Sequence, residues 1–253
     1  KEKILKNQTG KDYDKRTKIQ FYEDLKALKE NVSVTIDPFF LSPENFFYLG
    51  GVSNTQTVDC NENGYFSNYF SDRYGFNNID AEWDEQEIEF FLIGDSFVHG
   101  SCVNRPDDIA SNLRKLGNNP VLNLGYRGNG PLTQYATLRE YLPKNTKNIL
   151  WFYFEENDLS DLKLEMKSET LLNYLRDKKY SNNLKTKQKQ IDQMLKLKIK
   201  NNVIKKKELD KYWESYYSTK KKLLRFIRLN QFKRFLISIK KNRSKNDDNF
   251  TLS

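Results

Sequence analysis

Hydrophobic and polar positions alternate along this chain with two different periods, which divide it into elements. In residues 18–29 ("KIQFYEDLKALK") apolar side chains recur at helical spacing, whereas "VSVTI" (32–36) is β-branched and predicts a strand closed by Pro38. Residues 39–78 are aromatic and rich in Gly and Asn, as is typical of short hairpins or packed loops. Residues 1–85 are therefore expected to form an N-terminal module of one αβ unit and an aromatic loop region.

Three short apolar runs follow, at residues 88–93, 121–124 and 148–154. Segments with helical periodicity, 107–116 and 132–142, separate them. Parallel strands joined by crossover helices have this pattern, and strands buried on both faces appear as uninterrupted apolar runs. The sequence thus predicts an α/β core over residues 86–161 with a mostly parallel sheet.

The character of the chain changes again in residues 162–253, where lysines dominate and strand signals fade. The stretch "KLLRFIRLNQFKRFLISIKK" is too mixed for one amphipathic helix, but two short helices broken near Asn230 fit its pattern. This third region is expected to be a basic helical segment that acts as a cap or an insertion.

Composition narrows the classes of partner. The chain has 253 residues, 37% of them hydrophobic, which suffices for the core of one large domain or two modest ones. The net charge of +9 arises largely from the lysine-rich helices, which form either a solvated face or a surface for an anionic membrane or an acidic polysaccharide. Nucleic acid is a less favoured partner, because no recognised binding motif is present.

The ends of the chain and its cysteines bear on location. No stretch reaches the roughly 20 apolar residues of a membrane span, and the first residues contain neither an initiator Met nor a signal-peptide core. The expectation is a segment of a longer protein, anchored or targeted from upstream of Lys1. Cys60 and Cys102 lack metal-ligand spacing; they would form a disulfide in an exported protein and remain free thiols otherwise. The acidic run near residue 155 has no accompanying histidine, so no metal site is expected.

Candidate chemistry begins at "FFLIGDSFVHG", where the first buried run ends at Gly94. A glycine-led turn at the carboxyl end of a parallel strand places the next side chains in the crevice where such sheets bind ligands. Ser96 is thus a candidate nucleophile, although Asp95 or Ser96 could equally serve as the cap of the following helix. The motif is not G-x-S-x-G, because Val98 occupies the second glycine position.

The second and third apolar runs end in comparable signals. "LNLGYRGNGP" has glycines that allow close backbone approach to a ligand, but their order does not fit a dinucleotide fingerprint. "FYFEENDLSD" supplies the amide of Asn157, with a helix cap as the alternative role, which Asp158 and Ser160 could share.

Together the three blocks resemble the SGNH, or GDSL, hydrolase family. The resemblance implies a three-layer α/β/α fold with a flavodoxin-like, mostly parallel sheet, and no cofactor. It further implies that Ser96 is the nucleophile and that Gly128 and Asn157 are oxyanion-hole donors. Asp95, His99 and Asp158 are candidates for residues that position these three. One departure is that Glu155 stands where the family motif G-x-N-D has glycine.

The wider context, including "CNENGY" and "DRYGFNN", is similar to a bacterial branch of that family associated with cell-envelope and surface-polysaccharide chemistry. This similarity covers roughly residues 10–165. It implies an envelope or periplasmic location, with a cytoplasmic one left open, and an acylated carbohydrate or another ester as substrate. The expected activity is that of a serine esterase or O-acyl transferase.

The sequence assigns no residue with certainty as the general base that would activate Ser96. His99, the single histidine, lies three residues after Ser96 and so on roughly the same helix face, but in that position it would leave little room for substrate. Packing is its alternative role. The family's base comes from a D-x-x-H block, which residues 159–253 lack. Either the sheet and that block continue beyond Ser253, or the chain is an inactive relative that binds a glycan or organises an envelope assembly.

Overall fold

The computed structural model describes residues 2–37 and 47–247, which fall into two compact units divided between Lys200 and Asn201. Pro38 and the first part of the expected loop region, up to residue 46, lie outside the described residues. The strands are β1 (Val32–Val34), β2 (Gln56–Val58), β3 (Asn68–Phe70), β4 (Ile88–Ile93), β5 (Val121–Asn123) and β6 (Thr146–Trp151). All six belong to the first unit.

The N-terminal module contains a small sheet in the order β1-β2-β3. It follows α1 (Glu2–Thr9) and α2 (Lys18–Leu28), and α2 starts with a capping box between Thr17 and Gln20. Strands β1 and β2 pair in parallel, whereas β2 and β3 are antiparallel. The αβ unit and the hairpin expected from the sequence are both present, with β1 two residues shorter than predicted.

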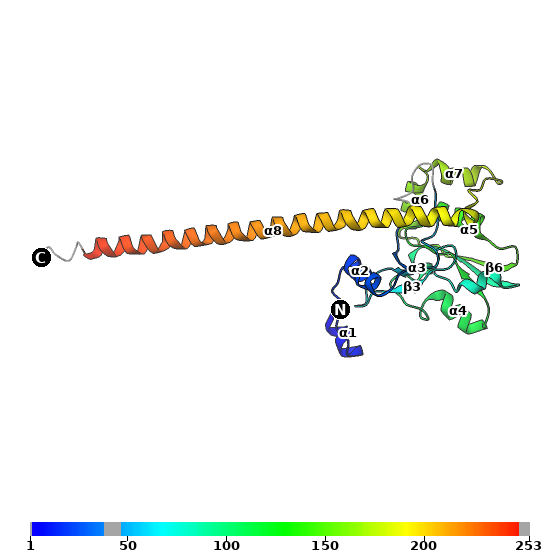
Figure 1. Cartoon of the computed structure of the whole chain (residues 1–253), viewed down its shortest axis with the longest axis horizontal. Coiled ribbons are helices and arrows are strands. Elements are labelled where there is room, and N and C mark those ends of the chain that lie inside the picture. Colours follow the sequence, from blue (N-terminus) through cyan, green and yellow to red (C-terminus); the bar gives the residue numbers. More distant parts are fainter. Residues whose placement is uncertain (1, 38–46, 248–253) are drawn as a thin grey trace. The chain divides into compact units, whose positions relative to one another are not determined.

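The core contains a parallel sheet in the order β5-β4-β6. Helix α4 (Ile109–Gly117) connects β4 to β5 and packs against β5, and α5 (Pro131–Tyr141) connects β5 to β6 and packs against β4. Figure 1 shows these two helices on either side of the strands. The predicted α/β core with parallel strands is confirmed, and all three strands lie within two residues of their predicted starts.

Strand β6 is largely exposed, including the apolar residues of its second half. Within the described ranges it pairs only with β4, and the Trp151 side chain is 45% exposed. Phe152, Tyr153 and Phe154, which continue the same apolar run beyond the strand, are exposed as well. A strand edge of this kind presents unpaired N–H and C=O groups, to which a further strand can add.

Residues 158–200 pack in the same unit as the core. Here α6 (Asp158–Glu165) and α7 (Glu169–Arg176) contact α5. The buried carboxylate of Glu140 in α5 accepts hydrogen bonds from the Tyr174 hydroxyl (2.6 Å), the Asn182 N–H (2.6 Å) and the Leu184 N–H (2.9 Å). The structural boundary therefore falls at residues 200 and 201, whereas the sequence suggested 161 and 162.

The end of the described chain is one helix, α8 (Gln188–Asp247). The predicted break near Asn230 is wrong, because the backbone is helical throughout this range. No Gly or Pro occurs between residues 188 and 247, and one Asn costs a helix only about 0.7 kcal/mol relative to Ala. Of the helices that the structure describes, none is long and apolar enough to cross a membrane.

Cys60 and Cys102 form a disulfide that joins the loop after β2 to the segment after α3 (Ser96–His99). It closes a loop over a sequence separation of 42 residues. Such a loop restricts the unfolded chain, which is the main source of disulfide stabilisation in the chain-entropy description.

We predict that the double variant Cys60→Ser/Cys102→Ser unfolds with a free energy about 2–4 kcal/mol lower than the wild type. Urea titration followed by tryptophan fluorescence measures the difference. Reductant should weaken the wild type similarly and leave the double variant unchanged. Two free thiols in the denatured, unreduced wild-type protein would show that the bond is not formed.

Candidate functional site

The three parallel strands end at one edge of the core sheet. Strand β4 lies between β5 and β6, so the two crossover connections diverge at its carboxyl end, the position where open α/β sheets form a ligand crevice. Ser96 follows β4, the loop of residues 125–130 follows β5, and Asn157 lies beyond β6. The structure thus places all three sequence-predicted blocks along this edge.

Ser96 is the first residue of α3, and Asp95 is the cap of that helix. The Asp95 carboxylate accepts a hydrogen bond from the Phe97 N–H (2.9 Å). Because Asp95 performs the capping, the Ser96 hydroxyl is not needed for it. That hydroxyl belongs to a half-buried residue, and no hydrogen bond from it is present within the described ranges.

The glycines after β5 meet two different steric requirements. A Cβ on Gly125 would lie 2.6 Å from the His99 backbone nitrogen, so only glycine allows this close approach to α3. Gly128 has φ of +75°, a conformation that favours glycine. A Cβ there would lie 3.0 Å from the Cβ of Asp37. Gly128 therefore borders Asp37 of the N-terminal module and is itself exposed.

Asn157 occupies the N-cap position of α6, but its side chain does not cap the helix. Its amide nitrogen donates to the Asp161 carboxylate at 3.0 Å, which leaves the second N–H of that amide for another acceptor. The neighbouring Asp158 is fully buried and accepts a hydrogen bond from the Phe154 N–H (2.7 Å). Asp158 thus fixes the chain that enters α6, while the Asn157 amide remains partly available.

Carboxylates give this edge a negative field. Burial raises the pKa of Asp158 and of Asp161 above the usual value; the hydrogen bonds from Phe154 and Asn157 oppose this shift, and the charge of Asp95 adds to it. Burial also raises the pKa of Glu165, whose carboxylate accepts from the Gly130 N–H (2.7 Å) and so caps α5. Across the described residues no His, Cys, Asp and Glu side chains are grouped so as to hold a metal ion. Glu155, which stands where the G-x-N-D motif has glycine, and the neighbouring Glu156 are both exposed.

The structure brings the three predicted site residues to one edge but does not join them directly. Within the described ranges no hydrogen bond connects Ser96, Gly128 and Asn157. Indirect links do exist: the Phe97 ring, next to the serine, contacts the Phe154 ring (centroids 4.8 Å apart), and the charge of Asp95 acts on Asp158 beside the asparagine.

His99 does not serve as the base of Ser96. It is 1% exposed, its Nε2 lies 3.1 Å from the Tyr69 hydroxyl, and its Nδ1 lies 3.1 Å from the Ser101 hydroxyl. Both ring nitrogens are therefore occupied, and the ring packs against those of Tyr69 and Tyr126. Burial lowers the pKa of His99 to about 4, against an opposing effect of Asp59. The packing role is the one that the structure supports.

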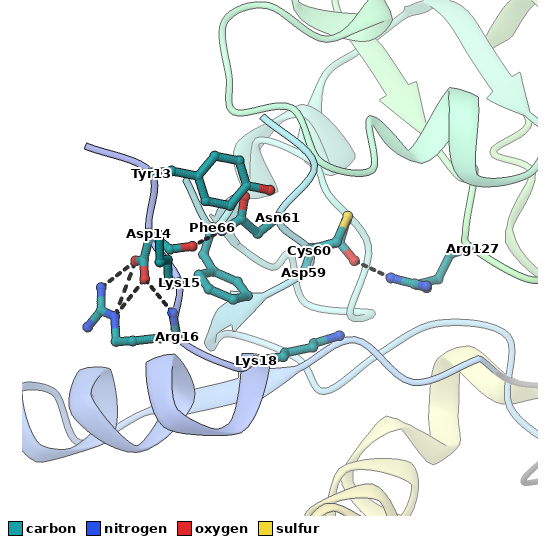
Figure 2. Close-up of a pocket in the computed structure, with 10 residues that line it drawn as sticks. All are labelled: Tyr13, Asp14, Lys15, Arg16, Lys18, Asp59, Cys60, Asn61, Phe66 and Arg127. Carbon is teal, nitrogen blue, oxygen red and sulfur yellow. Dashed lines mark hydrogen bonds and ion pairs between the residues drawn. The ribbon is translucent and has the colours of Figure 1, made fainter. Parts of the chain in front are cut away.

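A pocket of about 370 Å³ that the sequence did not indicate lies at the N-terminal module (Figure 2). Its lining combines residues 13–18, the segment after β2 and the loop after β5: Tyr13, Asp14, Lys15, Arg16, Lys18, Asp59, Cys60, Asn61, Phe66 and Arg127. None of the predicted catalytic residues borders it. Only the disulfide and the glycine-rich loop that contains Arg127 stood out in the sequence.

Asp59 is the centre of the polar network at this pocket. Its Oδ1 accepts from the Arg127 guanidinium (2.9 Å) and from the Thr35 hydroxyl (2.7 Å). Arg127 also donates to Asp37 (2.9 Å). Burial alone would raise the pKa of Asp59, but His99, the Thr35 hydrogen bond, Arg127 and Lys18 together lower it to about 2. The network needs residues from the segments after β1, after β2 and after β5, so no local motif reveals it.

Comparison of the chain with protein-family models, with curated proteins and with solved structures gives no match in any of the three. The geometry of the two sites therefore carries the functional argument.

We predict that His99 makes the fold sensitive to mild acid. Its folded pKa of about 4 lies below the ordinary value of 6.5, so the unfolded state binds a proton first as the pH falls. The resulting decrease in the free energy of unfolding is absent above pH 6.5 and reaches about 3 kcal/mol near pH 4.

Urea unfolding of wild type and His99→Gln between pH 7 and pH 4 tests this prediction. His99→Gln is expected to lose about 3 kcal/mol less than the wild type over that range, whatever its stability at pH 7. Parallel losses in both proteins would assign the acid sensitivity to other groups. Asp59 changes the free energy of unfolding only below about pH 3.8, because its pKa is lower in the folded state than in the unfolded state.

Proposed function

We propose that this chain carries the nucleophile side of an SGNH-type serine esterase or O-acyl transferase, in a three-layer, flavodoxin-like fold. The observation that carries the proposal is the position of Ser96 at the carboxyl end of the middle strand, with its hydroxyl free of the capping role. The order β5-β4-β6 corresponds to 2-1-3 in sequence order of the core strands, which is how flavodoxin-like sheets begin.

The surroundings of Ser96 suit an acyl group. Phe97 is 61% exposed, and its ring centroid lies 4.8 Å from that of Phe154, another exposed aromatic. This apolar pair lies beside the serine, where the acyl chain of an ester would lie during attack. The backbone N–H groups of Ser96 and Gly128 and the second amide N–H of Asn157 would then stabilise the oxyanion.

The base must come from elsewhere, since the one histidine of the chain is bonded to Tyr69 and Ser101. The exposed edge of β6 offers a position for a further strand. A D-x-x-H block reaching the same edge from such an addition would complete the triad. The substrate class that we favour is an acylated bacterial glycan, on the strength of the sequence resemblance, and the cell envelope is the corresponding location.

The same histidine geometry favours one alternative, a catalytically inactive module. A chain without a base for Ser96 would still present a crevice with an amide, backbone donors and an exposed aromatic pair. Those groups suit binding of a glycan or organisation of an envelope assembly.

We predict that, in the natural protein that carries residues 1–253, Ser96→Ala abolishes hydrolysis of p-nitrophenyl acetate. Asn157→Ala is expected to lower kcat by about 10²–10³ because one oxyanion donor is lost. Ser111→Ala, on α4, is the matched control and should retain full activity. Initial rates together with far-UV circular dichroism separate catalytic from folding defects. Activity that persists in Ser96→Ala, or no activity in the wild type, would favour the binding module.

A further inference from the structure

The pocket of Figure 2 contains a lysine in an unusual setting. Lys18, the first residue of α2, is half-buried and lines the pocket with Asp59 and Arg127. Its ammonium nitrogen lies 2.7 Å from the Thr35 hydroxyl oxygen and 3.2 Å from the Thr35 carbonyl oxygen. The bonds recorded for this nitrogen within the described ranges thus both go to one residue.

The direction of these hydrogen bonds is fixed by the next member of the network. The Thr35 hydroxyl donates its hydrogen to the carboxylate of Asp59 (2.7 Å), because an ionised carboxylate can only accept. The hydroxyl therefore accepts from Lys18, as the carbonyl does. Two of the N–H groups of Lys18 are satisfied in this way, and no residue in the described parts of the chain bonds to the third tetrahedral position of the nitrogen.

A neutral amine fits this arrangement without losing a hydrogen bond. An uncharged –NH₂ group has two N–H donors and one lone pair, so Thr35 takes both donors and the lone pair occupies the remaining position. A charged –NH₃⁺ group would direct its third N–H to that position. The hydrogen bonds with Thr35 therefore accommodate the neutral, nucleophilic form of the side chain as well as the charged form.

The electrostatic surroundings agree with the geometry. Burial, with a smaller contribution from the charge of Arg127, lowers the pKa of Lys18 to about 8, and the charges of Asp59 and Asp37 oppose this shift. The other titratable group coupled to Lys18 is His99, which is buried and neutral at pH 7. An ordinary exposed lysine has a pKa near 10.4, so roughly a hundredfold more of Lys18 is neutral at pH 7.

We propose that Lys18 is an amine nucleophile that forms an imine with the carbonyl group of a small aldehyde bound in this pocket. This site is separate from the serine edge and stands independently of the proposed esterase function. The lone pair of Nζ attacks the carbonyl carbon to give a carbinolamine. Two protons move from nitrogen to oxygen overall, the C–O bond breaks, water leaves and the C=N bond remains, with no oxidant or reductant needed.

The pocket suits an aldehyde of the size of a ring or a short sugar. Its volume of about 370 Å³ is at the lower end of ordinary ligand sites. Phe66 offers an apolar wall whose ring stacks on that of Phe21. The Asn61 amide also lines the pocket, where it donates to the Asp14 carbonyl oxygen (2.8 Å) and accepts from the Gly64 N–H (2.8 Å).

The test uses the full chain, pyridoxal as the aldehyde, and borohydride to trap the imine as a stable secondary amine. Labelled positions are mapped by peptide mass spectrometry across pH 6–10. The expected result is a Lys18 yield at least tenfold above that of Lys26, an exposed lysine on the same helix, at pH 7.5, with half-maximal labelling near pH 8. The chain's α-amino group also reacts near this pH, and the peptide map separates it from Lys18.

Comparing two lysines within one folded sample avoids dependence on a variant that fails to fold. Lys18→Arg is expected to lose this labelling and leave that of Lys26 unchanged. Lys18 labelling no greater than that of Lys26, or a Lys18 profile that is still rising at pH 10 without a plateau, would overturn the proposal.

Discussion

The turn that carries Ser96 depends on buried polar side chains that must bond to one another because water is excluded. Asn123, fully buried at the end of β5, donates to the Val98 carbonyl oxygen in α3 (2.6 Å) and exchanges hydrogen bonds with Asn78. Asn78 in turn donates to Asp72, which also accepts from backbone N–H groups of its own turn and from an indole N–H. An unpaired member would cost about 1–3 kcal/mol. This requirement holds the aromatic loop, β5 and the turn that carries Ser96 in one arrangement.

A second network of polar contacts joins the N-terminal module to the core. Arg127, in the loop after β5, donates to Asp59 and Asp37 of the N-terminal module, and the Cys60–Cys102 disulfide joins the same parts covalently. The N-terminal module is therefore a structural component of the core as well as the wall of a pocket. The two candidate sites share the loop after β5. Arg127 lines the pocket, whereas Gly128, the next residue, is a candidate residue of the serine edge.

The charges of the two sites differ in a way that matters for function. Carboxylates surround the serine edge, where Asp158 and Asp161 have raised pKa values, so an anionic substrate group would be repelled there. The apolar pair Phe97 and Phe154 offsets that field by offering a surface for neutral groups. The Lys18 pocket is instead lined by basic side chains, among them Lys18 and Arg127, which bond to residues after β1 and β2. The neutral ester proposed for the first site is compatible with this negative field, because it brings no further negative charge to that edge.

The sequence by itself determined the parallel strands β4, β5 and β6 and their helices, because uninterrupted apolar runs and helical periodicity are local signals. It also placed Ser96 and Asn157 at one edge, since parallel strands end together. Only the tertiary structure decided that His99 bonds to Tyr69 and Ser101, because those contacts depend on packing between loops. The Lys18 pocket and the unbroken helix α8 could likewise not be predicted from the sequence. The first needs three distant segments to meet, and the second reflects a weak Asn signal overridden by good helix formers.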